Sequence, residues 1–306
     1  MASSTVSGVA VIDKPRGLTS HAVVAQARRV FGRKDLGHAG TLDPMATGVL
    51  LILVGQACKL SGYLTADSKR YAAEITFGRA TSTLDAEGET TEERPLEPGS
   101  LTPAAVEAAL AAERERREQT PPAVSAIKVD GQRAYALARR GEPPELPPRP
   151  VEVLQLTALE LDPPRLRCEV WVSKGYYVRS LARDLGERLG TVAHLSALRR
   201  LASGPFDLAQ ASAWPAPEPP PLIGLSEAVR AVMPACVLSE AAILRARQGK
   251  QLEPSEFLEL PAGETPGAWL SPRGELIAIG TRSGELRVLR GFAAEGTRTV
   301  SIQGDS

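Results

Sequence analysis

The stretch Gly37-His38-Ala39-Gly40-Thr41-Leu42-Asp43-Pro44-Met45-Ala46-Thr47-Gly48 places one carboxylate among turn-forming residues, directly before the apolar run at 49–54. Glycine adopts backbone conformations that other residues avoid, and proline restricts the chain just after the acid. The run Val-Leu-Leu-Ile-Leu-Val is typical of a buried strand. The sequence therefore predicts a rigid scaffold that holds Asp43 in a loop. By itself, a glycine-rich loop with an Asp-Pro turn is more often ordinary turn chemistry than a catalytic site.

Regular elements are expected on both sides of this loop, from alternating and helical patterns of apolar residues. The expected strands are residues 8–13, 70–77, 151–161 and 166–173, and the expected helices are residues 20–31, 102–117 and 176–189. In the last helix, Val178, Leu181 and Leu185 mark the buried stripe. Arg179 is expected near the start of that helix, off the stripe.

Proline-rich stretches divide the chain. Residues 119–146 contain Pro121-Pro122 and several further prolines, which predicts a protruding loop that contacts a partner. Residues 214–221 hold five prolines in eight positions, a composition that sustains neither a helix nor a central strand. We therefore expect a catalytic domain over residues 1–213, a linker over 214–222 and a second, β-rich domain over 223–306.

Composition limits the class of protein. The 306 residues are 43% hydrophobic and 24% charged, ordinary values for a globular protein. No apolar run reaches the length of a membrane span, and the N-terminus lacks a signal-peptide pattern, so a cytoplasmic protein without membrane contact is expected. The three cysteines and three histidines are scattered without zinc spacing, so no metal site is expected.

The charges balance, with 36 basic and 36 acidic residues, which argues against a nonspecific nucleic-acid coat. Local basic pairs remain candidates for phosphate contacts, although an ordinary solvated surface explains any one of them equally well. These pairs are Arg28-Arg29, Arg33-Lys34, Arg139-Arg140 and Arg199-Arg200.

Several motifs resemble those of one enzyme family. The block at 37–48 is similar to the catalytic motif of TruB-type tRNA pseudouridine synthases, and the segment at 11–20, Val-Ile-Asp-Lys-Pro-Arg-Gly-Leu-Thr-Ser, matches that family's N-terminal signature. Three further segments agree in order and spacing: Lys69-Arg70-Tyr71, Gln-Thr-Pro-Pro-Ala-Val-Ser-Ala-Ile-Lys at 119–128, and Ser-Lys-Gly-Tyr-Tyr-Val-Arg-Ser at 173–180. The resemblance covers roughly residues 8 to 205 strongly and the C-terminal part weakly.

The resemblance implies a fold and an activity. The fold would be α+β, the pseudouridine synthase fold with a central mixed, largely antiparallel sheet flanked by helices, plus a small C-terminal β-rich PUA-type domain. The activity would be isomerisation of uridine 55 in the T-loop of tRNA to pseudouridine, by base flipping and without guide RNA, cofactor or metal. The partner would be tRNA, gripped at the T-arm and the acceptor end, and we expect a monomer.

The resemblance also implies three catalytic residues. Asp43 would be the nucleophile, attacking C1' of the ribose or C6 of the base, a choice that the sequence leaves open. Arg179 matches the cationic partner that keeps this carboxylate ionised. Tyr71 matches the aromatic residue that stacks on the target base. Without the family, Tyr71 would be read as a core aromatic and Arg179 as a helix surface residue.

Four further positions match substrate-binding residues of the family. Tyr177 and Leu198 match pocket residues, His38 matches a residue that draws the base out of the RNA, and Asp85 matches a further polar member of the site. Asp13 and Asp184 are rival candidates for the nucleophile, but a structural ion pair is the better interpretation of each.

Two other functions stay open at this stage. One is a guide-RNA-dependent synthase, because such relatives share the Asp43 motif; the protruding segment at 119–140 favours the standalone type. The other is an RNA-folding protein whose main role is binding, with isomerisation secondary.

Overall fold

A ten-stranded mixed sheet forms the centre of the molecule, with the strand order β11-β12-β4-β13-β3-β1-β15. The computed structural model describes residues 6–65, 68–97, 99–125, 127–129, 131–134, 137, 140–142 and 144–294. The sheet strands are β1 (Gly8–Lys14), β2 (Leu36–Ala39), β3 (Thr47–Val54), β4 (Ser68–Phe77), β11 (Val153–Asp162), β12 (Arg165–Ser173), β13 (Ala193–Ser203), β14 (Phe206–Asp207), β15 (Ser212–Ala213) and β16 (Ile223–Gly224). Most neighbours pair antiparallel, while β13 with β3 and β1 with β15 pair parallel. The predicted α+β class and its mixed, largely antiparallel sheet are confirmed.

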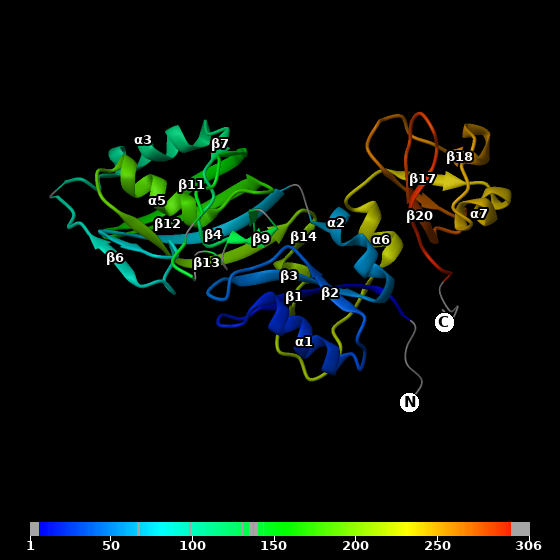
Figure 1. Ribbon diagram of the computed structural model, residues 1–306, viewed down its shortest axis with the longest axis horizontal. Helices are drawn as coiled ribbons and strands as arrows, with labels where there is room; N and C mark the ends of the chain where they lie inside the picture. Colours follow the sequence, from blue (N-terminus) through cyan, green and yellow to red (C-terminus); the bar gives the residue numbers. More distant parts are fainter. Residues whose placement is uncertain are drawn as a thin grey trace.

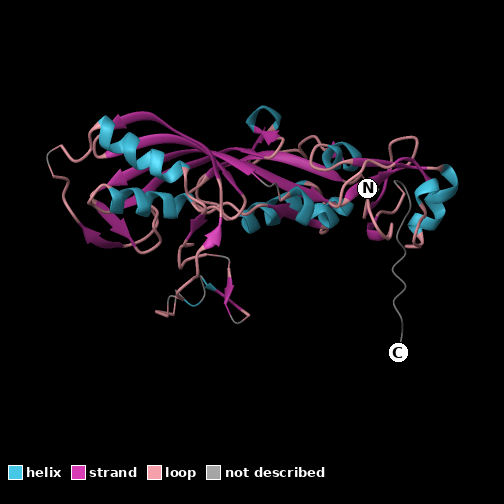
Figure 2. Cartoon of the chain, turned by 90° about the horizontal axis from the view of Figure 1, so that it is seen from above, coloured by secondary structure: helices cyan, strands magenta, loops and turns pink. Residues whose placement is uncertain are grey.

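Helices pack mainly along one side of this sheet (Figures 1 and 2). Helices α1 (Ser20–Val30), α3 (Pro103–Arg114) and α5 (Val178–Arg188) pack on this side, whereas the 3-10 turn η1 (Gly55–Leu60) and α2 (Ser61–Leu64) pack on the opposite face. The hydroxyl of Thr19 caps α1 by accepting a hydrogen bond from the Ala22 amide at 3.0 Å, and Thr102 caps α3 in the same way. The predicted helices therefore begin where the sequence placed their caps.

Helix α5 matters most for the site. Its buried residues include Val178, Leu181 and Leu185, as its apolar spacing predicts. Arg179 was expected off this stripe, but it is also buried, with 6% of its surface exposed. Arg179 does leave the apolar stripe, but it is not a surface residue, because the segments that carry Thr83 and Val124 cover the first turn of α5.

The segment at 119–146 projects away from the sheet (Figure 2). Its base is tied by the pair β7 (Glu118–Gln119) and β10 (Arg149–Pro150), and a short hairpin β8 (Lys128–Val129) with β9 (Gln132–Arg133) lies farther out. Several of its residues, Arg139 among them, lie outside the described residues. A second hairpin, β5 (Arg79–Thr81) with β6 (Thr90–Glu93), lies at another edge of the molecule.

A smaller five-stranded sheet with the order β18-β17-β19-β20-β21 follows near the C-terminus. Its elements are β17 (Ala235–Leu238), β18 (Phe257–Glu259), β19 (Gly267–Leu270), β20 (Leu276–Gly280) and β21 (Val288–Gly291), with α6 (Leu225–Arg230), α7 (Glu240–Arg247) and the 3-10 turn η3 (Pro254–Glu256). Another 3-10 turn, η2 (Leu208–Gln210), lies between β14 and β15 of the main sheet. Trp269 fills its core edge-on to Phe257, with ring centres 5.0 Å apart. The end of the expected second domain, residues 295–306, lies outside the described residues.

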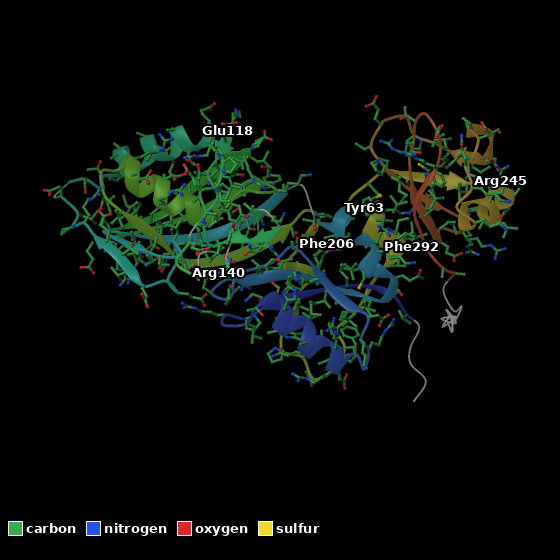
Figure 3. All side chains as sticks on the ribbon, viewed as in Figure 1. Tyr63, Glu118, Arg140, Phe206, Arg245 and Phe292 are labelled. Carbon is green, nitrogen blue, oxygen red and sulfur yellow. The ribbon has the colours of Figure 1, made fainter. Side chains whose placement is uncertain are left out.

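The two sheets share one apolar cluster. Leu51 and Leu53 of β3 pack in the same cluster as Leu225 of α6, Leu270 of β19 and Phe292. Figure 3 labels Phe206, Tyr63 and Phe292 at this junction. The short strand β16 also pairs with β1, so the main sheet continues past the expected linker. Within the described ranges, no helix combines the length and apolar character that a membrane span requires.

Candidate active site

Asp43 lies in the loop between β2 and β3, which pair antiparallel on either side of it. The loop is bounded by Gly40 and Gly48, whose φ angles are +77° and +101°. L residues with side chains rarely adopt these angles. A Cβ atom at Gly48 would also collide with the backbone carbonyl of Arg200 on β13. The glycines thus let the loop lie directly against β13.

Two polar side chains from the N-terminal segment fix the loop. The Ser20 hydroxyl donates to the carbonyl of Leu42 at 3.1 Å and accepts from the Leu42 amide at 2.9 Å. The Lys14 ammonium donates to the carbonyls of Leu18 at 2.7 Å, Pro15 at 2.9 Å and Pro44 at 3.3 Å. Lys14 is buried, and desolvation lowers its pKa to about 8. The residues on both sides of Asp43 are therefore held by neighbours from another segment.

Arg179 makes an ion pair with Asp43, with 3.0 Å between Nε and Oδ2. The guanidinium also donates from Nη1 to the carbonyls of Thr83 at 3.1 Å and Val124 at 3.0 Å. The Arg179 side chain is 7% exposed, whereas that of Asp43 is 37% exposed. A buried cation thus holds a carboxylate that an incoming substrate can reach.

Asp85 is the second carboxylate near this cation, with its Oδ2 3.7 Å from Arg179 Nε. Its Oδ1 accepts from the Thr83 hydroxyl at 2.5 Å and from the Glu87 amide at 3.0 Å. The Asp85 segment is docked on β13 by backbone bonds with Leu195. Asp85 is therefore held by its own segment, and its carboxylate lies near the same Arg179 nitrogen that contacts Asp43.

Tyr71 lies on β4 and faces Arg200 across the β4–β13 pairing, where the two side chains share a hydrogen bond. Burial raises the pKa of the Tyr71 phenol, and the Arg200 guanidinium opposes that shift. The negative charge of Asp43 adds to the rise in the pKa of this phenol.

Tyr177 precedes the first turn of α5 and is clamped by Gln119. The Tyr177 amide donates to Gln119 Oε1 at 2.8 Å, and Gln119 Nε2 donates back to the Tyr177 carbonyl at 3.2 Å. Burial raises the pKa of the Tyr177 phenol, and the positive charge of Arg179 is the largest effect that opposes this rise. The clamp fixes the backbone from which both Tyr177 and Arg179 project.

His38 and Leu198 lie on either side of this centre. The rings of His38 and His21 are nearly perpendicular, with their centres 5.1 Å apart. Burial lowers the pKa of His38, and the charges of His21 and Arg200 lower it further. Its Nδ1 is buried without a hydrogen-bond partner. Leu198 lines a cavity of about 380 Å³ that also borders the Asp43 loop through Met45 and Thr47. Both residues are near the loop, but neither forms a hydrogen bond or an ion pair with Asp43 within the described part of the chain.

The rival carboxylates are structural. Asp13 pairs with Arg199 at 2.6 Å, and Asp184 pairs with Arg116 at 3.0 Å and Arg183 at 2.7 Å, as the sequence indicated. Arg200 is fully buried, so the suggestion that the Arg199-Arg200 pair contacts phosphates was wrong for Arg200. Across the described part of the chain, no group of three or more His, Cys, Asp or Glu side chains is arranged to hold a metal ion.

The sequence reasoning missed Lys14, Arg200 and Gln119 as parts of the site. A partial signal for Arg200 existed: it lies two residues after Leu198, and side chains two apart in a strand share a face, but no strand was predicted over these residues. Lys14 and Gln119 lie within the motif segments at 11–20 and 119–128, but sequence reasoning assigned neither of them a role, because the contacts with Pro44 and Tyr177 join segments distant in sequence.

Comparison with known proteins agrees with this geometry. The family model for the N-terminal domain of TruB pseudouridylate synthases matches residues 28–178, and that for the C-terminal domain of tRNA pseudouridylate synthase B matches residues 179–214. The chain is 44% identical over 303 residues to tRNA pseudouridine synthase B of Mycobacteroides abscessus, covering 97% of this chain and 95% of the relative. It is 43% identical to the enzyme of the same name from Thermobifida fusca, covering 94% and 98% of the two chains.

Among solved structures, a chain of a Cbf5-Nop10-Gar1 complex superposes with a TM-score of 0.72 at 24% identity, covering 93% of this chain and 84% of that one. A chain of an H/ACA RNP bound to a substrate RNA containing 2'-deoxyuridine gives a TM-score of 0.71 at 21% identity, covering 94% and 86%. These likenesses establish the pseudouridine synthase fold. With both family models and near full-length relatives in agreement, the chain belongs to the TruB family of tRNA pseudouridine synthases, which are isomerases.

Proposed function

We propose that this chain converts uridine 55 in the T-loop of tRNA to pseudouridine, with Asp43 as the nucleophile and without a guide RNA. The observation that carries this proposal is the contact of Arg179 with Asp43 at 3.0 Å, between a buried guanidinium and a partly exposed carboxylate. A cation at this distance favours the ionised form of a carboxylate, which is the nucleophilic form. The relatives' shared name supports pseudouridine synthesis on tRNA, and the motif resemblance implies position 55.

The reaction breaks the bond between N1 of uracil and C1' of the ribose, turns the base and joins C5 to C1'. Asp43 forms a covalent bond either with C1', which releases the base, or with C6, which activates the ring. In both routes the carboxylate is released at the end, and the C5 proton leaves the base while N1 gains one. Tyr71, held by its hydrogen bond with Arg200, supplies an aromatic face that grips the base without preventing rotation.

The target base is stacked inside folded tRNA, so it must leave the stack to reach Asp43. We assign this step to His38 and the pocket around the base to Tyr177 and Leu198. His38 is half-buried, and its lowered pKa keeps the ring neutral at pH 7. A neutral ring is better suited to stacking against a base than to forming an ion pair with the RNA backbone.

We further propose a monomer in the cytoplasm, with the projecting segment at 119–146 and the first unit gripping the T-arm. The C-terminal sheet, as a PUA-type domain, would then contact the acceptor end. The near balance of acids and bases means that shape and placed contacts decide recognition.

The test uses purified protein and an unmodified tRNA transcript, with no other macromolecule present. Pseudouridine mapping is expected to find one modified position, uridine 55. Modification that appears only after a guide RNA is added would support the guide-dependent alternative. Refolding of tRNA without any modification would support the RNA-folding alternative.

A further inference from the structure

Arg200 ties together the two ends of the Asp43 loop. None of its surface is exposed. Its Nε donates to the carbonyl of Val49 at 2.7 Å, after the loop, while Nη2 donates to Gly40 at 2.9 Å and Nη1 to Thr41 at 3.4 Å, before Asp43. One planar group therefore fixes the chain on both sides of the carboxylate.

The backbone of Arg200 adds a second constraint on the same loop. Arg200 pairs with Gly48 where β13 meets β3, and the approach is so close that only glycine fits at position 48. The side chain of Arg200 cannot shift along the loop while this register holds. Its three donors are thus directed at fixed carbonyls.

Arg200 also contacts Tyr71, which lies directly opposite it on β4. The guanidinium donates to the phenol oxygen, which fixes the position of the outer end of the ring. The same side chain therefore contacts both the loop that carries Asp43 and the aromatic residue expected to grip the base.

No carboxylate forms an ion pair with Arg200 among the residues that the structure describes. Its charge is balanced by backbone carbonyls and by one phenol, in the interior of the protein. Burying a cation without an anionic partner is costly, and an apolar side chain would fill the same space without that cost. A role of Arg200 in arranging the active site explains why a charged side chain occupies this buried position.

We propose that Arg200 is a positioning residue that holds the Asp43 loop and the Tyr71 phenol in one reactive arrangement. This inference rests on the roles proposed above for Asp43 and Tyr71. Lysine cannot replace it, because one ammonium group cannot reach three carbonyls and a phenol from the directions that a guanidinium serves.

The experiment compares Arg200→Lys with Arg282→Lys in full-length protein. Arg282 is the matched control, because it is also a buried arginine whose guanidinium donates to the backbone carbonyls of Pro261, Ala262 and Thr265, but it lies in the C-terminal sheet. Both variants are expected to lower the unfolding temperature. Only Arg200→Lys is expected to lower the single-turnover rate of pseudouridine formation, by about 100-fold, with tRNA affinity unchanged.

A double-mutant cycle with Tyr71→Phe separates positioning from general loss of stability. If Arg200 acts partly through the phenol, Arg200→Lys costs less in the Tyr71→Phe background than in the wild type. Should Arg200→Lys fail to fold, Arg200→Gln against Arg282→Gln gives the same comparison. Wild-type turnover in a folded Arg200 variant would overturn the inference, and so would an equal loss of turnover in Arg282→Lys. If the effects of Arg200→Lys and Tyr71→Phe are fully additive, the part of the inference that concerns the phenol contact is wrong. An inactive wild type would instead refute the proposed function.

Discussion

At the scale of single residues, the position of the Asp43 carboxylate depends on the Arg179 guanidinium, which donates to three groups. Nε meets Asp43, while Nη1 meets the carbonyls of Thr83 and Val124. Lysine would keep the charge but lose this fork. We expect Arg179→Lys to lower the single-turnover rate by about 100-fold, with a smaller effect on tRNA binding. Rates close to wild type in a folded variant would remove Arg179 from the site.

Lys14 predicts a pH dependence. Its pKa is lowered to about 8 by burial, so the ammonium loses a proton within an accessible range. The neutral amine has two N–H groups for three carbonyls, and the longest contact, to Pro44 at 3.3 Å, is the one expected to break. The single-turnover rate should therefore fall as pH rises through about 8. Lys14→Met should be slower than wild type below that pH but show no such fall; the same fall in both proteins would count against Lys14 as its cause.

The sequence could indicate some of these residues and not others. Asp43 was found because glycine, proline and a carboxylate are clustered locally, and Arg179 and Tyr71 because motifs of a known family contain them. The burial of Arg200 and Lys14 could not be inferred from pattern alone, since a charged residue in a strand or turn is usually exposed. Their environment exists only once β13 lies against the loop.

At the scale of elements, the start of α5 is held by Gln119 and by a buried polar cluster. Tyr176 donates to Glu113 at 2.8 Å, Arg116 pairs with Glu113 at 2.5 Å, and Arg116 also reaches Asp184 on α5. Desolvation raises the pKa of Glu113, and the bonds from Arg116 and Tyr176 oppose this. Helix α5 is thereby joined to α3, and the Arg179 position is fixed relative to the sheet.

Removing the Gln119 clamp should move Tyr177 and Arg179 together. We expect Gln119→Leu to lower the single-turnover rate by about tenfold, because small misplacements of reacting groups slow catalysis strongly. Glu118→Gln is the matched control, since Glu118 is the exposed neighbour on the same short strand. Stopped-flow kinetics on both variants would check this. Equal rates in the two variants would show that the clamp does not position the site.

Element identity was more predictable than element placement. The caps and periodicity of α1, α3 and α5 located them to within a few residues, because those signals are local. That the segment between β5 and β6 docks through Asp85 onto Leu195 of β13 could not be foreseen, since the bridge joins residues more than a hundred positions apart. The PUA-type identity of the C-terminal sheet stays a prediction.

At the scale of the whole molecule, the two sheets share a core. Phe292 is 4% exposed and packs in the cluster that contains Leu51 and Leu53 of β3. Gln56 and Lys59 add hydrogen bonds to the backbone of Ala293 and Gly291. The proline-rich composition of residues 214–222 suggested that the two domains are independent units. Composition does not indicate which contacts the segments before and after this stretch make in the folded protein. Trp214 in that stretch is buried and donates to Gln26 at 2.9 Å.

This shared core predicts one cooperative unfolding transition, measurable by calorimetry. Phe292→Ala should lower the stability of the whole chain by about 3 to 5 kcal/mol, because it leaves a cavity between the two sheets. Leu258→Ala, at an exposed position, should leave the transition in place. Two separate transitions in the wild type would mean that the sheets unfold independently.

The most direct test of the account is the single-turnover rate of Asp43→Asn on unmodified tRNA. Asparagine keeps the size of the side chain but removes the nucleophilic charge, so pseudouridine formation should be undetectable while tRNA binds with wild-type affinity. Asp13→Asn, which removes the rival carboxylate paired with Arg199, should retain turnover. Pseudouridine formed by Asp43→Asn near the wild-type rate would contradict the assignment of this loop as the active centre.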